Sequence, residues 1–225
     1  MSRVDDLTRS LVGKKVVMAL TGVVLLLFVL GHMIGNLKVF FGAEHFNAYA
    51  EGLRTVGAPF FARGQLLWLV RLVLIAAAIG HVWSAWEVTS ASWAARPHGY
   101  RRLALVETTY AARAMRVTAV ILLGYLVYHL LDLTFGSANP SFNPGDAYHN
   151  LLASFSRPTV SLFYVLAMGL LGLHLYHGIY SACQTLGLDH PRYGAWRRRG
   201  AAIFTAVVTA GFAAVPLAVL AGVLR

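Results

Sequence analysis

The sequence predicts an all-α fold, an integral membrane bundle of five transmembrane helices. The first observation is composition: the mean hydropathy of the chain is +0.63, and only 12% of its 225 residues are charged. These values lie outside the range of soluble domains. The second observation is that five segments are apolar over the roughly 20 residues that a helix needs to cross the hydrocarbon core. No repeat or composition change divides the chain, so we expect a single membrane domain over residues 1–225.

The predicted spans follow one another along the chain with turn-forming residues between them. They cover about residues 16–41, 66–93, 117–135, 159–186 and 202–224. The separating stretches are Gly57-Ala58-Pro59, Arg96-Pro97-His98-Gly99, Asn139-Pro140 and Asp189-His190-Pro191. The first apolar run is too long for a signal peptide and lacks a small-residue cleavage pattern, so we expect it to be retained as a span.

Basic residues predict the orientation of the bundle. Lysine and arginine outnumber aspartate and glutamate by 19 to 9, and most of them fall on the side of the membrane that holds the N-terminus. They are Arg3, Arg9, Lys14, Lys15, Arg96, Arg101, Arg102, Arg113, Arg116, Arg192, Arg197, Arg198 and Arg199. The positive-inside rule therefore predicts a multi-pass membrane protein with a cytoplasmic N-terminus, and we expect it in the cell inner membrane. Because the charge is explained by orientation and by contact with membrane lipid, we expect no nucleic-acid partner.

The nine histidines divide into two groups. Four lie one in each loop, where a solvated role is the simplest interpretation: His45, His98, His149 and His190. The others lie within the first four spans: His32, His81, His129 and the pair His174 and His177. An ionisable side chain inside a membrane is costly and needs a partner.

Depth sorts the intramembrane histidines into two layers. At about 1.5 Å of rise per residue, each of His32, His81, His129 and His174 lies beyond the middle of its own span. Because consecutive spans run in opposite directions, His32 and His129 are predicted near the outer face, and His81 and His174 near the cytoplasmic face.

Two layers of paired imidazoles favour ligation of two porphyrin irons, each by two histidines from facing helices. A single intramembrane histidine would more simply be an interhelical hydrogen-bonding group or part of a proton path. Zinc is less favoured, because neither layer has further ligands for a tetrahedral site, and the single Cys183 excludes an all-cysteine site. Glycines beside the histidines would let a flat ring approach the helices, although ordinary helix packing explains them equally well. These glycines are Gly31, Gly35, Gly80, Gly169, Gly172 and Gly178.

His174 and His177 compete for one ligand position, because residues three apart share a helix face. His174 precedes the loop residue Asp189 by the same spacing that separates His81 from Arg96. We therefore choose His174 as the ligand. We interpret His177 as a residue that hydrogen-bonds a haem propionate or neighbouring backbone.

The stretches "VLGHMIGNL", "AIGHVWSAW", "LVYHLLDLTF" and "HLYHGIYSACQTLG", with the loop "GAEHFNAYAEGLRTVG", resemble the dihaem cytochrome b membrane anchor of succinate:quinone oxidoreductases. The resemblance implies two haem b groups, a distal one on His32 and His129 and a proximal one on His81 and His174. It also implies two partners on the cytoplasmic face, a flavoprotein subunit and an iron–sulfur subunit. Electrons would pass from the iron–sulfur subunit through the haems to a quinone, commonly menaquinone.

Three further polar residues are candidates within this framework. Arg71, inside the second span, would meet a distal haem propionate or extend to the outer headgroups. Asp132 would move protons to the quinone or, as we slightly prefer, cap the end of its helix in water. Glu51, in the outer loop, is a quinone-site candidate as a proton carrier, or a solvated carboxylate.

The chain itself carries no succinate chemistry: it has no dinucleotide fingerprint and no cysteine set for a cluster. We therefore expect an electron-transfer subunit of an oxidoreductase. The same build could serve a fumarate reductase, since sequence does not give the direction of the reaction. A polytopic metal-ion transporter is the less favoured alternative, because Asp132 is the only carboxylate close to an intramembrane histidine.

Overall fold

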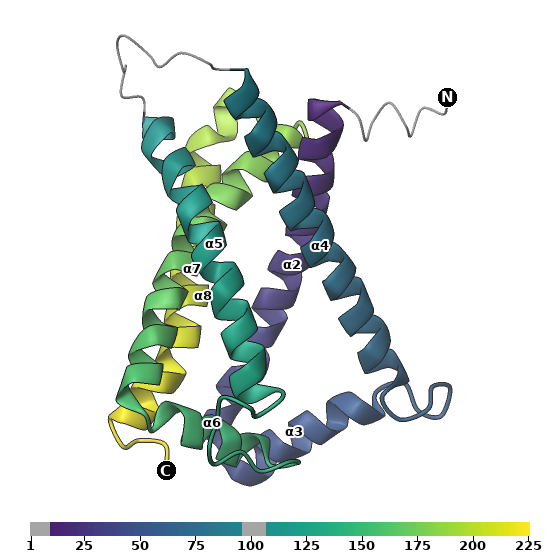
Figure 1. The fold of residues 1–225 in the computed structure, drawn as a ribbon, viewed down its shortest axis with the longest axis vertical. Coiled ribbons are helices and arrows are strands. Elements are labelled where there is room, and N and C mark those ends of the chain that lie inside the picture. Colours follow the sequence, from purple (N-terminus) through teal and green to yellow (C-terminus); the bar gives the residue numbers. More distant parts are fainter. Residues whose placement is uncertain (1–9, 96–106) are drawn as a thin grey trace.

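The computed structural model describes residues 10–95 and 107–225, and within these residues all regular structure is helical. Five helices are long and apolar enough to cross a membrane, which confirms the predicted all-α membrane bundle (Figure 1). They are α2 (Leu11–Leu37), α4 (Gln65–Ala94), α5 (Glu107–Leu133), α7 (Pro158–Thr185) and α8 (Gly194–Leu220). Two short 3-10 helices are also present: η1 (Lys38–Phe41) follows α2 directly, and η2 (Pro191–Tyr193) directly precedes α8.

Three of the spanning helices begin well before their apolar segments. Helix α2 starts at Leu11, α5 at Glu107 and α8 at Gly194, whereas the apolar runs predicted starts near residues 16, 117 and 202. The added turns contain charged and polar residues, because a helix satisfies its backbone hydrogen bonds whether or not its side chains are apolar. Hydropathy therefore measures the membrane-embedded part of a helix and not its full length.

Two further helices occupy segments that we expected only as loops: α3 (Ala43–Thr55) and α6 (Ala147–Phe155). Asp146 caps α6 by accepting a hydrogen bond from the backbone N–H of His149 at 2.9 Å. Asn47 of α3 donates to the Asp146 carboxylate at 2.9 Å and accepts from the Tyr148 backbone at 2.9 Å. These bonds join α3 to α6 at the end of the bundle that also holds the C-terminus (Figure 1).

The two ends of the bundle differ in charge and structure. We call one the α3/α6 end. The other, where α2 and α8 begin and α4 and α7 end, is called the basic end because Lys14, Lys15 and the run Arg197–Arg199 lie there. Arg3, Arg9, Arg96, Arg101, Arg102 and His98, which the sequence assigned to this side or its loops, lie outside the described residues.

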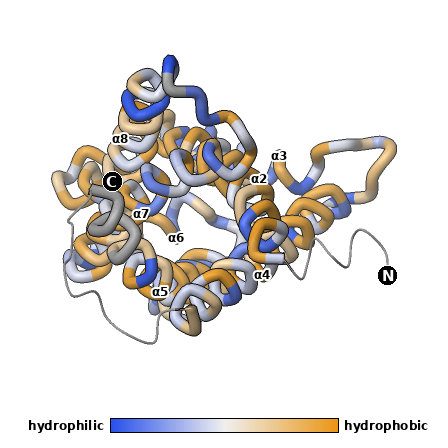
Figure 2. Tube along the Cα trace, turned by 90° about the horizontal axis from the view of Figure 1, so that it is seen from above, coloured by the Kyte–Doolittle hydropathy of each residue, from blue (hydrophilic) through white to orange (hydrophobic). Residues whose placement is uncertain are grey.

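The spanning helices pack in a defined order around a common axis, as Figure 2 shows from above. Helix α2 packs along α4 and also against α7 and α8, while α5 packs on α7, and α7 on α8. Many apolar side chains point outward, among them Val120, Leu166 and Ile203, each more than half exposed. Outward apolar side chains are the arrangement expected of a protein whose solvent is lipid.

Candidate metal centres

The structure brings the intramembrane histidines together in two pairs. The rings of His32 and His129 lie 5.9 Å apart, centroid to centroid, with their planes at 84°. The rings of His81 and His174 lie 6.3 Å apart with their planes at 63°. Helices α2 and α5 supply the first pair and α4 and α7 the second. The most extensive helix packing in this bundle is between α7 and α8 and between α2 and α4. Neither histidine pair joins helices that pack in this way.

Backbone and hydroxyl groups of α2 orient His81. Its Nδ1 lies 3.0 Å from the carbonyl oxygen of Met18 and 3.4 Å from the Thr21 hydroxyl. A carbonyl only accepts, so Nδ1 carries the proton and the Nε2 lone pair is left free. Gly22 makes room for this ring, since a Cβ at that position would lie 3.2 Å from the His81 ring. An imidazole held through one nitrogen to a backbone carbonyl is the usual arrangement of a metal-binding histidine.

His174, rather than His177, faces His81 in the part of the chain that the structure describes. The Nδ1 atom of His174 is buried and has no hydrogen-bond partner among those residues. Buried polar atoms are nearly always paired, so this nitrogen marks a place where a further group would fit. His177 lies three residues along the same helix and is partly buried.

Aromatic rings surround the other pair. His32 stacks on Phe28 at 5.2 Å and lies 5.8 Å from Phe212. His129 stacks on Tyr125 at 5.8 Å, and its Nδ1 lies 3.5 Å from the Tyr164 hydroxyl. The pair is thus enclosed by side chains from α2, α5, α7 and α8.

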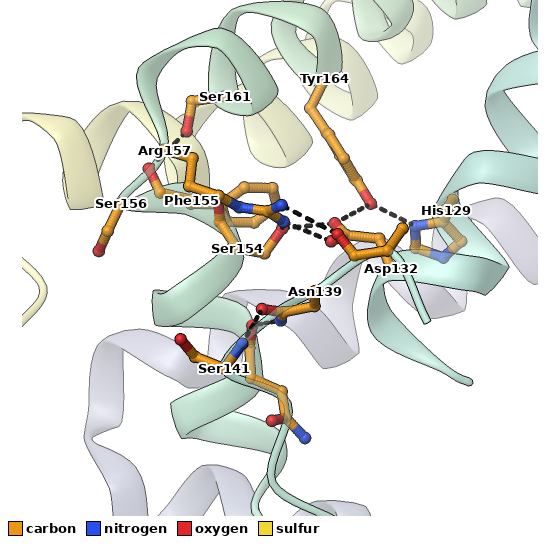
Figure 3. A network of polar contacts seen from close by, with 12 residues as sticks. His129, Asp132, Asn139, Ser141, Ser154, Phe155, Ser156, Arg157, Ser161 and Tyr164 are labelled. Atoms are coloured by element: carbon orange, nitrogen blue, oxygen red, sulfur yellow. Dashed lines mark hydrogen bonds and ion pairs between the residues drawn. The ribbon is translucent and has the colours of Figure 1, made fainter. Parts of the chain in front are cut away.

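Asp132, one turn beyond His129, is fully buried. Its carboxylate accepts hydrogen bonds from the Tyr164 hydroxyl at 2.9 Å, from the Arg157 guanidinium at 2.5 Å and from the Ser154 hydroxyl (Figure 3). Our preferred expectation of a helix cap in water is therefore wrong. A carboxylate at this depth requires a cation and hydroxyl donors, and residues beyond the following loop supply them.

Three partners of Asp132 were not predicted from the sequence: Ser154, Arg157 and Tyr164. Arg157 follows a loop on the side opposite the N-terminus, where an isolated arginine gives no signal of a buried partner, and the two hydroxyl residues carry no signal of their own. The available clue was the carboxylate itself, because an aspartate inside the last turn of an apolar span needs a partner. Arg157, directly before α7, is the first arginine after Asp132 along the chain.

Glu51 and Arg71 meet at a pocket of about 210 Å³ at the α3/α6 end, together with Arg54. Glu51 forms ion pairs with Arg63 at 2.5 Å and Arg54 at 3.2 Å. The Arg71 guanidinium is exposed and lies 5.0 Å from the Trp68 ring centroid. Leu133 and Thr134 also line the pocket, whereas the preceding Asp132 side chain turns toward Tyr164.

The glycines near the histidines fall into two groups. A Cβ would overlap Tyr49 at Gly35 and Thr209 at Gly172, and at Gly80 it would lie 3.3 Å from Thr21, so helix packing explains these three. At Gly31, Gly169 and Gly178, apart from the two adjacent residues and the helix's own backbone, no described atom lies within 4 Å of the Cβ position. Open space of this kind beside the histidine layers is compatible with a flat group lying against the helices.

The geometry of both pairs fits a metal held between two imidazoles. Metal–imidazole bonds of about 2 Å require ring centroids about 6 Å apart, and the two observed separations agree with this. Among the described residues, no group of three or more His, Cys, Asp and Glu side chains is placed to hold a metal ion. A pair of imidazoles at this separation suits an iron whose remaining ligands come from a porphyrin.

The described histidines that we expected in loops lie away from both pairs, although His45 and His149 lie within α3 and α6 and not in loops. His45, His149 and His190 are exposed, and the His149 Nε2 atom lies 2.9 Å from the Ser141 carbonyl oxygen. They are therefore not placed to contribute to the two centres.

Fold and site together define a multi-pass membrane protein that holds pairs of imidazoles inside its helical bundle. Residues 94–214 match the family described as the succinate dehydrogenase/fumarate reductase transmembrane subunit. The chain belongs to this family. No curated protein and no solved structure shows significant similarity to the chain.

The matched region contains α5, α6 and α7 and most of α8, and with them His129, Asp132 and His174. His32 and His81 precede it. Membership makes the chain a membrane subunit of succinate dehydrogenase or fumarate reductase, an oxidoreductase complex that also has soluble catalytic subunits.

Proposed function

We propose that this chain is the dihaem cytochrome b anchor of its complex and that it carries electrons from an iron–sulfur subunit to menaquinone. The observation that supports this most strongly is the apposition of two histidine pairs, His32 with His129 and His81 with His174. When bound, haem b supplies one-electron oxidation and reduction of its iron.

Neighbouring residues of the chain orient the histidines that would bind the haem irons. Met18 fixes the His81 ring through Nδ1, and Phe28 and Tyr125 stack on His32 and His129. The aromatic rings around His32 and His129 would keep water away from a group bound there. His177 would hydrogen-bond a propionate of the proximal haem or nearby backbone.

The basic end is the proposed docking face for the iron–sulfur subunit and, through it, the flavoprotein. Arg198 and Arg199 are exposed there, whereas Arg197 is paired with Asp189 and lies over the Tyr180 ring. Exposed arginines favour an acidic partner surface or anionic lipid. In this orientation the basic end would be cytoplasmic, and His81 and His174 would hold the proximal haem.

The α3/α6 end is the proposed quinone end. The pocket lined by Glu51, Arg54 and Arg71 offers a carboxylate and two guanidiniums beside the end of α5. Glu51 would carry protons to the quinone, and Arg71 would bind a distal haem propionate. Asp132 remains a candidate proton carrier for the quinone. Its side chain does not line the pocket, although that of the adjacent Leu133 does, and it contacts the Tyr164 hydroxyl.

The same arrangement serves succinate oxidation or fumarate reduction, since the direction depends on the potentials of the partners. No observation favours the metal-ion transporter, because the described histidine layers offer a transported ion only two nitrogens each.

Haem analysis of the complex purified from membranes in mild detergent tests the proposal. A pyridine haemochrome assay should give about two haem b per chain, with flavin and iron–sulfur subunits copurifying. One haem per chain would contradict the pairing. A colourless chain would overturn the assignment as a cytochrome.

A further inference from the structure

The Tyr164 hydroxyl lies between a carboxylate and a histidine. It is 2.9 Å from Asp132 Oδ2 and 3.5 Å from His129 Nδ1 (Figure 3). Tyr164 is 4% exposed, and its ring packs on Phe155 at 4.9 Å and on Tyr125 at 5.2 Å. The hydroxyl is therefore held in place by the packing of its ring.

Counting donors and acceptors fixes the direction of these bonds. Asp132 receives the Arg157 guanidinium and the hydroxyls of Ser154 and Tyr164. An ionised carboxylate only accepts, and a phenol has one proton to give. That proton goes to Asp132, so the Tyr164 oxygen is left with lone pairs that accept from His129 Nδ1–H.

A histidine that donates from Nδ1 has its lone pair on Nε2. Resting on the haem assignment above, we infer that Tyr164 is a positioning residue that holds His129 as the Nε2-binding tautomer. Through Tyr164 the negative charge of Asp132 also makes the imidazole more electron-rich. A more basic ligand stabilises oxidised iron, so this chain of bonds lowers the reduction potential of the centre on His32 and His129.

Among the described residues, no carboxylate is linked through a hydroxyl to His81 or His174. His81 donates to the neutral carbonyl oxygen of Met18. A change at Tyr164 should therefore alter one centre and leave the other unchanged. A general loss of packing would not show this selectivity.

The experiment compares Tyr164→Phe with Tyr125→Phe in the purified complex. Both variants remove one phenolic hydroxyl from the same aromatic cluster. The Tyr125 ring stacks on His129, and no hydrogen bond joins its hydroxyl to Asp132 or His129 in the described structure. The readouts are potentiometric titration of each haem band and the low-temperature electron paramagnetic resonance spectrum. A His129→Ala sample identifies the bands of the other centre.

In Tyr164→Phe we expect a positive shift of the potential of the His32 and His129 centre, or selective loss of that centre. The other centre and the Tyr125→Phe variant should match the wild type. Asp132→Asn combined with Arg157→Gln should shift the same potential in the same direction, which covers the case in which Tyr164→Phe does not assemble.

Unchanged potentials in Tyr164→Phe, or an equal shift in Tyr125→Phe, would overturn the inference. A wild-type complex without haem would overturn the proposed function itself, and the unmodified protein shows this before any variant is compared.

Discussion

The guanidinium of Arg157 lies 2.5 Å from the carboxylate of Asp132, which has no exposed surface. Arg157 also donates to the carbonyl oxygen of Ala138 at 2.9 Å. These contacts tie the end of α5, the following loop and the start of α7 into one unit. The arginine is itself partly exposed, so the pair connects the interior of the bundle to its surface.

Removing the cation should destabilise the fold. Arg157→Gln leaves a buried carboxylate without its counter-charge, and we expect a loss of about 3 kcal/mol. Thermal unfolding of the detergent-solubilised complex, followed by circular dichroism, measures this. Asp132→Asn with Arg157→Gln should cost less than the two single changes added together. If Arg157→Gln unfolded at the same temperature as the wild type, the ion pair would contribute little to stability.

Replacing histidines should remove haems selectively. His32→Ala or His129→Ala should remove one haem and leave the other, while His81→Ala or His174→Ala should do the reverse. His45→Ala, on exposed α3 surface, is the control and should keep both haems. His177→Ala should change a potential and keep the haem. If His177→Ala loses the haem and His174→Ala keeps it, the choice of ligand is wrong.

Filling open space at Gly31 should lower haem content. Apart from the two adjacent residues and the helix's own backbone, no described atom lies within 4 Å of a Cβ at Gly31 or at Gly52 of α3, but only Gly31 adjoins a paired histidine. Gly31→Leu should therefore fold and bind less haem, because its side chain enters the space beside His32. Gly52→Leu should keep the wild-type haem content, measured by absorbance per milligram of protein. Equal haem in both variants would exclude a porphyrin from the space beside Gly31.

The α6 cap should make stability depend on pH. Hydrogen bonds from the His149 backbone and the Asn47 side chain hold the pKa of Asp146 below its usual range. The resulting stabilisation is present above the ordinary pKa of about 3.9 and is lost as the pH falls through the lowered value of the folded protein. Asp146→Ala should cost about 1 kcal/mol at pH 7.

Asp146→Asn isolates the charge, because asparagine is also a good N-cap. Its melting temperature should lie below that of the wild type at pH 7. The two temperatures should converge as the pH is lowered below about 4. A constant difference down to pH 3 would mean that the charge of Asp146 is not responsible.

Labelling should show which end of the bundle faces the cytoplasm. In a Cys183→Ser background, cysteines at Ser92 of α4 and Gly194 of α8 should react with an impermeant maleimide only after the cells are opened. Phe60→Cys, at a position 91% exposed beyond α3, should react in intact cells. The opposite pattern would reverse the proposed orientation and the docking face.

The sequence alone determined the class of fold and the order of the spans. Runs of about 20 apolar residues have few alternatives to a membrane-spanning helix, because every backbone polar group must be satisfied inside the hydrocarbon core. It also determined which histidines could meet. Depth follows from position along a helix, and alternating direction places His32 level with His129 and His81 level with His174, the pairs that the structure brings together.

Only the tertiary structure decided which polar residues meet and which glycines are packed. Asp132 and Arg157 lie 25 residues apart, and the Tyr164 hydroxyl reaches the same carboxylate from a different helix. Helix α3 meets α6 through Asn47 and Asp146, which are 99 residues apart. Hydropathy and periodicity describe a single helix, and they predict how deep each residue lies in the membrane and on which face of the helix it lies. A hydrogen bond depends on distances of a few ångströms between side chains on different helices, and those distances exist only after the helices have packed.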